Sequence, residues 1–230
     1  VEGVACTTGL GRLEVRKRNL YGGDGRLTTP YHQQVEDMIA GELIDELERD
    51  CHYRERQQEI RAFNRTSPVI KRGIALTPVK FGISFTKTES NQAGALVHVY
   101  TDGSIHLNHG GTEMGQGLYT KVAQVVADEF QVDLDRIKVT ATTTGKVPNT
   151  SATAASSGSD LNGMAAANAA QQIKERLVKF AAERWNVTEA DVAFEPNTVR
   201  IGAERLSFNE FIKIAYGARI QLSAAGFYKT

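Results

Sequence analysis

The feature that most constrains the fold is an Asp-Gly pair between two apolar runs. Asp102-Gly103 separates alternating apolar residues, and this arrangement is a strong predictor of a two-residue β-hairpin turn. In that register Tyr100 faces Ile105. His98 then faces Leu107, and both faces of the hairpin carry apolar groups. We therefore expect an antiparallel strand pair in a sheet that is covered on both sides.

Helical periodicity appears on either side of this hairpin. Upstream, residues 33–64 are expected to be helical, with one apolar stripe and an end before Pro68; the stripe consists of Val35, Met38, Ile39, Leu43 and Leu47. Downstream, helices are expected over 118–130 and over the Ala-rich residues 165–184. Ser207 and Glu210 have the spacing of a capping box at the start of a short helix over 206–216.

Strands are expected where the period falls to two or where short apolar runs lie between turns: 79–86, 137–141, two within 191–201, and 220–230. Gly22–Gly25 is expected to form a loop. The sequence thus predicts a mixed α/β fold with twisted sheets covered by helices. We divide it into a helical and linker segment over 1–78 and a main domain over 79–230.

Composition excludes several classes of function. Lys plus Arg and Asp plus Glu both number 27, which argues against a nucleic-acid surface and against a polybasic membrane anchor. No apolar run approaches the roughly 20 residues of a membrane helix, and residues 1–4 lack the features of a secretory signal. The isolated Cys6 and Cys51 fit a reducing, cytoplasmic compartment. Two thiols are too few for an iron–sulfur cluster. Because the chain begins with Val1, we expect it to start within a longer protein.

Two segments are rich in residues that contribute little to a core. His109–Gly117 is Gly-rich and precedes a helix, so backbone amides there can approach an anion. Its spacing resembles a P-loop, but Gln116 stands where the phosphate-binding Lys is required. Val147–Asp160 is made mostly of small residues, whose backbone and hydroxyls can contact a flat ligand before a second helix begins. Either segment alone is also compatible with a ligand-free turn; together they favour a shared ligand.

The remaining polar candidates are weaker. His98, His106 and His109 lack an accompanying Cys or carboxylate at ligand spacing, so ordinary hydrogen-bonded histidines are favoured over a zinc site. In the expected register His98 and His109 share a face. Glu113 fits a backbone-bonded loop carboxylate better than a catalytic base.

Five ordered motifs resemble the molybdopterin-binding domain of the xanthine dehydrogenase and oxidase family. The resemblance covers nearly the whole chain, including 14–21 and 222–228, and its motifs are Phe81–Thr86, Asn91–Ser104, Gly110–Gly117, Val147–Ser156 and Asp160–Gly163. It implies that the chain is a fragment of a two-lobed molybdenum cofactor-binding domain, with 79–230 forming part of that domain.

The resemblance also implies roles for individual residues. Gly115 and Gln116 would bind the molybdopterin cofactor, and the small-residue loop would contribute Thr153, Ala154, Ala155 and Ser156. The backbone of Ala155 would lie nearest the molybdenum. Phe85 would pack edge-on against a purine and Thr86 would hydrogen-bond to it. Their presence favours a purine substrate, because related aldehyde oxidases lack Phe-Thr at this position.

Family members hydroxylate their substrate with water as the oxygen source and pass electrons through [2Fe-2S] clusters to FAD. In the intact, oligomeric enzyme we expect these groups in partner domains or subunits. The glutamate base is expected downstream of Thr230, so no catalytic residue is assigned here and the chain alone should not turn over. The main hypothesis is xanthine dehydrogenase acting on hypoxanthine and xanthine. The alternatives are an aldehyde oxidase-like or other N-heterocycle hydroxylase, and a non-catalytic cofactor- or partner-binding fragment.

Overall fold

The computed structural model describes residues 1–230 except 23–24, 31, 80 and 147–148. It separates into two compact units, Val1–Phe81 and Gly82–Thr230. Part of the expected Gly22–Gly25 loop, residue 80 of the expected 79–86 strand and the start of the small-residue segment therefore lie outside the described residues. The assignment of 1–78 and 79–230 as domains stays a prediction.

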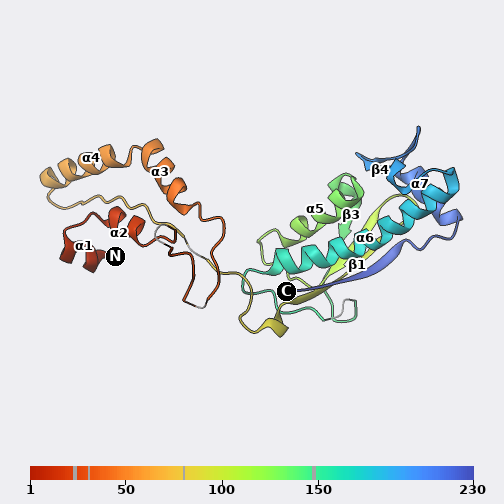
Figure 1. Ribbon diagram of the computed structural model, residues 1–230, viewed down its shortest axis with the longest axis horizontal. Coiled ribbons are helices and arrows are strands. Elements are labelled where there is room, and N and C mark those ends of the chain that lie inside the picture. The colour runs from red at the N-terminus through yellow and green to blue at the C-terminus, as the bar shows by residue number, and fades with distance from the viewer. Residues whose placement is uncertain (23–24, 31, 80, 147–148) are drawn as a thin grey trace. The chain divides into compact units, whose positions relative to one another are not determined.

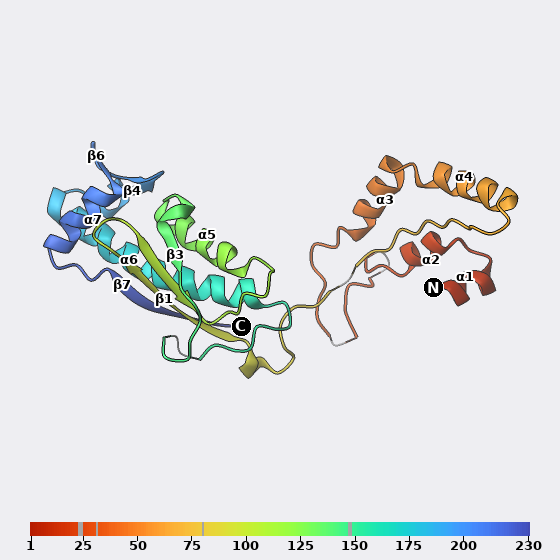
Figure 2. The same cartoon turned by 180° about the vertical axis from the view of Figure 1, so that it is seen from behind.

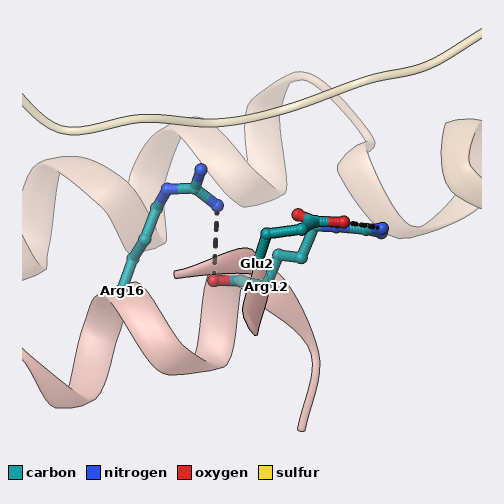
Figure 3. A network of polar contacts seen from close by, with 3 residues as sticks. All are labelled: Glu2, Arg12 and Arg16. Atoms are coloured by element: carbon teal, nitrogen blue, oxygen red, sulfur yellow. Dashed lines mark hydrogen bonds and ion pairs between the residues drawn. The ribbon is translucent and has the colours of Figure 1, made fainter. Parts of the chain in front are cut away.

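The described residues of the first unit form four helices: α1 (Glu2–Thr8), α2 (Arg12–Arg18), α3 (Ala40–Asp50) and α4 (Tyr53–Thr66). A small apolar cluster of Leu13, Ile44, Tyr53 and the loop residue Leu76 joins α2, α3 and α4. Lys17 on α2 donates to Asp45 (2.6 Å) and Glu48 (2.5 Å) on α3, and the two carboxylates raise the Lys17 pKa. Figure 3 shows a second polar link, in which the Arg12 guanidinium meets Glu2 of α1 while Arg16 donates to the Arg12 carbonyl.

The single helix expected over 33–64 is wrong. Residues 33–39 are not helical, and the chain breaks between α3 and α4 at His52, which has φ +50°. The expected inward stripe is exposed, since Leu43 and Leu47 are each more than half accessible, whereas Ile44 is buried. The face of α3 that packs against the rest of the unit is therefore centred on Ile44, one residue after the predicted Leu43. The end of α4 before Pro68 is confirmed.

The second unit contains a four-stranded sheet in the order β3-β2-β1-β7. Its strands are β1 (Gln92–Val99), β2 (Ile105–His109), β3 (Ile137–Val139) and β7 (Ser223–Lys229). β1 is antiparallel to β2 and β7, and β2 is parallel to β3. Helices α5 (Leu118–Phe130) and α6 (Gly158–Trp185) run along this sheet in Figures 1 and 2. The expected helices after Gly117 and over the Ala-rich stretch, and the strands at 137–141 and 220–230, are confirmed in kind.

A smaller antiparallel sheet is formed by β4 (Val192–Glu195), β5 (Thr198–Ile201) and β6 (Glu204–Ser207), followed by α7 (Phe208–Gly217). The turn between β4 and β5 and the capping box of Ser207 and Glu210 are confirmed. Short 3-10 turns complete the unit: η1 (Thr88–Ser90), η2 (Leu134–Arg136) and η3 (Glu189–Asp191).

The hairpin exists, but its predicted register is wrong by one residue. Val99, not Tyr100, pairs with Ile105, and His98 pairs with His106. The Asp102 carboxylate accepts bonds from the Ser104 amide (2.9 Å) and hydroxyl (2.6 Å) within a three-residue turn, which the bond from the Tyr100 amide to the Ser104 carbonyl closes. A one-residue shift moves every side chain to the other face.

The corrected register builds the core on one face of the sheet. Val97, Val99, Ile105 and Leu107 are fully buried with the inner faces of α5 and α6. His109 belongs to this buried face, whereas His98 lies on the opposite face. The prediction that the two histidines share a face is therefore wrong. The opposite face carries exposed Tyr100 and Phe227. Among the described residues, helices thus cover one side of the sheet and not both.

The strand expected over 79–86 is also wrong. The described residues of this segment have no regular secondary structure, and Val79, Phe81 and Ile83 are exposed. Ser84 has φ +76°, which interrupts an extended chain. The backbone of this segment bonds to a loop and to a buried side chain, as described below.

Candidate functional site

The Gly-rich loop connects the end of β2 to the start of α5. Two of its glycines permit close packing. A Cβ atom on Gly110 would lie 2.3 Å from the Thr150 side chain, and one on Gly111 would lie 2.5 Å from a Leu118 methyl group and 2.8 Å from the Asn162 side-chain nitrogen. Thr142 supports the loop by donating its hydroxyl to the carbonyls of His109 (3.0 Å) and Gly111 (3.1 Å). The loop is therefore fixed to both the sheet and α6.

Glu113 caps the N-terminus of α5. Its carboxylate accepts bonds from the backbone amides of Gly115 (2.9 Å), Gly117 (3.0 Å) and Tyr119 (3.0 Å). These bonds, that from Tyr119 first, lower the Glu113 pKa. The prediction of a backbone-bonded loop carboxylate is confirmed. Because the side chain occupies the free amides and the positive end of the helix, α5 offers little to an external anion.

Gln116 is folded back into its own loop. Its side-chain nitrogen donates to the Thr112 carbonyl (2.9 Å), and its side-chain oxygen accepts from the Met114 amide (2.6 Å). These contacts hold the exposed loop in one shape.

The small-residue loop lies directly against the Gly-rich loop. The Thr112 amide donates to the Thr153 hydroxyl (2.8 Å). Ala155 and Ser156 both have left-handed backbone conformations, with φ +53° and +54°. Such conformations are uncommon for residues other than glycine.

The two loops share a pocket of about 440 Å³. It brings together five of the six predicted cofactor residues and several that sequence reasoning missed; the lining is Met114, Gln116, Leu118, Lys121, Thr153–Ser156, Gly158 and Ser159. The sixth predicted residue, Gly115, is not in this lining, and its amide is bonded to Glu113. Lys121 lies one turn into α5, so helical spacing from Gly117 was the signal that could have revealed it.

The pocket lining offers groups that favour a negatively charged ligand. In contrast to α5, the described residues place no side-chain cap on the N-terminus of α6, whose first turn starts at Gly158 on the pocket lining. Free amides and the helix dipole favour an anion there, and the Lys121 ammonium adds a cation. The hydroxyls of Thr153, Ser156 and Ser159 supply neutral hydrogen-bonding groups. Among the described residues, no group of three or more His, Cys, Asp or Glu side chains is placed to hold a metal ion directly.

Phe85 and Thr86 do not line this pocket but are tied to it. The Ser84 amide donates to the Ala155 carbonyl (2.9 Å). On the other side, the buried Asn91 side chain bonds to both the amide and the carbonyl of Phe85. Phe85 is half-buried and Thr86 is exposed. Asn91 gave no signal in the sequence, since the contact is made by an irregular segment.

His109 is the most strongly perturbed titratable group near the loops. It is fully buried, and burial lowers its pKa to about 4, with the Glu113 carboxylate opposing the shift. Its Nδ1 accepts the Gly111 amide (3.2 Å), and its ring packs edge-on against Tyr119. His109 is therefore neutral at pH 7 and supports the loop from below. His106 bonds to Thr140 through Nε2 (2.8 Å).

Comparison with known protein families identifies the domain. The family model of the molybdopterin cofactor-binding domain matches residues 46–230. The chain belongs to this family. It is 43% identical over 227 residues to mouse xanthine dehydrogenase/oxidase, covering 99% of the chain and 15% of that protein. It is 45% identical over 231 residues to nicotinate hydroxylase hnxS from Emericella nidulans, covering 100% of the chain and 16% of that protein.

A solved structure supports the mixed α/β fold. Quinoline 2-oxidoreductase from Pseudomonas putida 86 superimposes with a TM-score of 0.75 at 21% identity, over 98% of this chain and 31% of its own. The chain thus spans about 15% of the length of the curated relatives named above. Among the described residues, no helix is both long and apolar enough to cross a membrane. Cys6 and Cys51 are free thiols.

Proposed function

We propose that this chain forms the molybdopterin cradle and one wall of the substrate pocket in an enzyme of the xanthine dehydrogenase type. The enzyme would hydroxylate hypoxanthine and xanthine with water as the oxygen source. One observation carries the proposal: the two loops converge on a single pocket, and the Ser84–Ala155 bond attaches the Phe85 segment to that pocket.

The residues divide into groups that would hold different parts of the cofactor. Gln116 with Gly115 and the loop Thr153–Ser156 would contact the pterin, and the Ala155 backbone would lie nearest the molybdenum. Lys121 and the first amides of α6 would hold its phosphate. When bound, the molybdenum cofactor supplies the two-electron redox chemistry of the hydroxylation.

The proposed role of Phe85 and Thr86 is to bind and orient the substrate. An aromatic ring at the edge of a purine contributes roughly 0.5–1.5 kcal/mol, and the Thr86 hydroxyl is exposed for a hydrogen bond. The remaining parts of the proposal lie outside this chain: the glutamate base, the [2Fe-2S] and FAD domains or subunits, the rest of the molybdopterin domain, and the cytoplasmic oligomer. The chain alone is expected to be inactive.

A second candidate is hydroxylation of an anionic N-heterocycle such as nicotinate. The relative that carries this name is as similar to the chain as the xanthine dehydrogenase is. Lys87 also places an ammonium group directly after Thr86, where it pairs with Glu89 (3.2 Å). An ammonium at the pocket wall would attract a carboxylate-bearing substrate, whereas a neutral purine does not need it.

The first experiment measures molybdenum by elemental analysis and pterin by fluorescence after oxidative release from the purified 230-residue chain. Stoichiometric pterin supports a self-sufficient cradle. Absence of both means that the cradle needs the flanking parts of the enzyme, and the measurement is then repeated on the full-length protein. Absence of pterin there would leave a non-catalytic partner-binding fragment as the better description.

The second experiment compares hypoxanthine, xanthine, nicotinate and benzaldehyde as substrates of the full-length enzyme. Phe85→Ala should lower kcat/KM for xanthine by about tenfold at most, the upper end for one aromatic contact. Phe81→Ala, on the same segment but 68% exposed, is the matched control. An unchanged kcat/KM in Phe85→Ala removes Phe85 from the pocket. Preference for nicotinate, lost in Lys87→Met, favours the second candidate.

A further inference from the structure

Asn91 is a buried polar residue that the proposed mechanism does not use. Its side chain is 2% exposed and directly precedes β1. The side-chain oxygen accepts from the Phe85 amide (2.9 Å), and the side-chain nitrogen donates to the Phe85 carbonyl (2.8 Å). The oxygen and the nitrogen of the Asn91 side-chain amide therefore both bond to the Phe85 backbone.

The segment that carries Phe85 has little else to fix it. It has no regular secondary structure, and neither Phe81 nor Ile83 is buried. The Ser84 amide bonds to Ala155 on the cofactor loop. Three hydrogen bonds therefore fix the Phe85 backbone: one from the preceding Ser84 amide to Ala155, and two between Phe85 and the Asn91 side chain.

Asn91 is itself held at a junction of the fold. Its amide donates to the Thr88 carbonyl (2.9 Å) and its carbonyl accepts from the Thr230 amide (3.2 Å). The next residue, Gln92, accepts the Ser151 amide (2.9 Å) at the start of the small-residue loop. Asn91 therefore links the Phe85 backbone to the end of β7 and to the start of β1, next to the small-residue loop.

We infer that Asn91 is a positioning residue that holds Phe85 at a fixed place beside the cofactor pocket and thereby sets the preference for flat heterocycles over small aldehydes. The inference rests on the proposed function. Asn91 touches neither substrate nor cofactor in this scheme; it acts through the Phe85 backbone.

Two substitutions separate the two bonds. Asn91→Asp keeps the acceptor for the Phe85 amide but places an oxygen against the Phe85 carbonyl. Asn91→Leu removes both bonds at similar volume. Asn108→Asp is the matched control, because Asn108 is also fully buried and donates through its side-chain nitrogen to Thr140 and Ala141 rather than to Phe85.

The first readout needs no cofactor. Amide hydrogen exchange of Phe85 is measured by NMR in the 230-residue chain. We expect Phe85 to be protected in the wild type and in Asn91→Asp, and to exchange at least tenfold faster in Asn91→Leu. Asn108→Asp should leave it unchanged. Equal protection of Phe85 in wild type and Asn91→Leu would overturn the inference.

The second readout uses the full-length enzyme with hypoxanthine, nicotinate and acetaldehyde as probes. In Asn91→Leu we expect kcat/KM for the preferred heterocycle to fall about two- to tenfold, mainly through KM, as for loss of one aromatic contact. Acetaldehyde turnover and molybdenum content should change less than twofold. An equal fall for all three probes, as a merely structural role predicts, would overturn the inference.

The two readouts distinguish failure of the inference from failure of the proposed function. If the wild-type enzyme oxidises no heterocycle, the proposed function fails, while the exchange measurement still decides whether Asn91 fixes Phe85. If Phe85 is released in Asn91→Leu but the heterocycle selectivity of the same variant equals that of the wild type, the inference fails and the function stands.

Discussion

The sheet and α6 approach each other closely at Gly226 on β7, which allows a sharp test of the fold. A Cβ atom there would lie 2.0 Å from the Ala165 carbonyl oxygen and 2.6 Å from the Ala169 nitrogen of α6. Real Cβ atoms essentially never approach closer than 3.0 Å. Gly226→Ala must therefore move β7 from α6 by at least the 1.0 Å difference, because backbone atoms cannot rotate away.

This displacement opens the buried contact between β7 and α6. Ala165 and Ala169 are fully buried, so separation leaves apolar surface poorly packed. Overpacking of a core costs typically 1–3 kcal/mol, and a clash with backbone belongs at the upper end. We expect Gly226→Ala to lower the free energy of unfolding by about 3 kcal/mol. With a urea m-value of about 2 kcal/mol/M, the midpoint falls by about 1.5 M.

The single tryptophan provides the assay. Trp185, at the end of α6, packs against Phe180 and Phe211 within the second unit, so its fluorescence reports unfolding of that unit in urea. Gly217→Ala at the end of α7 is the control, since a Cβ there meets nothing within 4 Å. If Gly226→Ala unfolds within 0.3 M of Gly217→Ala, on the order of a fifth of the expected shift, the close approach of β7 and α6 is refuted.

Three further predictions concern the loops and α7. Burial lowers the His109 pKa from 6.5 to about 4. Between these two pH values the unfolded chain binds a proton at His109 and the folded chain does not, so the free energy of unfolding falls as the pH drops. From pH 7 to pH 5, the free energy of unfolding in urea should fall by about 2 kcal/mol more in wild type than in His109→Asn. Equal decreases in the two proteins would contradict the burial of His109. Glu113→Gln should speed amide exchange of Gly115, Gly117 and Tyr119, measured by NMR against Glu89→Gln, and unchanged exchange would rule out the cap. Ser207→Ala should cost about 1 kcal/mol in urea unfolding, as for other N-caps, and a cost near zero would remove the capping box.

The sequence predicted which elements form more reliably than how they pair. The Ala-rich α6 and the capping box at Ser207 follow from local preferences, which a single sequence contains. The hairpin was predicted from Asp102-Gly103, but its register was not. The reason is that the Tyr100 amide bonds to the Ser104 carbonyl and Gly103 has a left-handed backbone, which gives the three-residue turn instead of the two-residue one.

The candidate site was predicted as two loops but not as a connected structure. Small and Gly-rich segments before helices mark both loops, and the family resemblance assigned them to one cofactor. The bonds that connect them, such as Thr112 to Thr153 and Ser84 to Ala155, join residues far apart in sequence and leave no periodic pattern. The exposed face of α3 was mispredicted for a similar reason: several apolar residues compete for burial, and tertiary packing chose Ile44.

The self-capping of the Gly-rich loop has a consequence for ligand binding. Because Glu113 and Gln116 bond to the loop's own amides, contacts within the chain hold the loop, and a ligand that bound beside it would order little additional backbone. Binding would then leave almost no trace in the outline of this loop. Occupied and empty forms would differ in chemistry rather than in shape, so only a probe of the ligand itself would tell them apart.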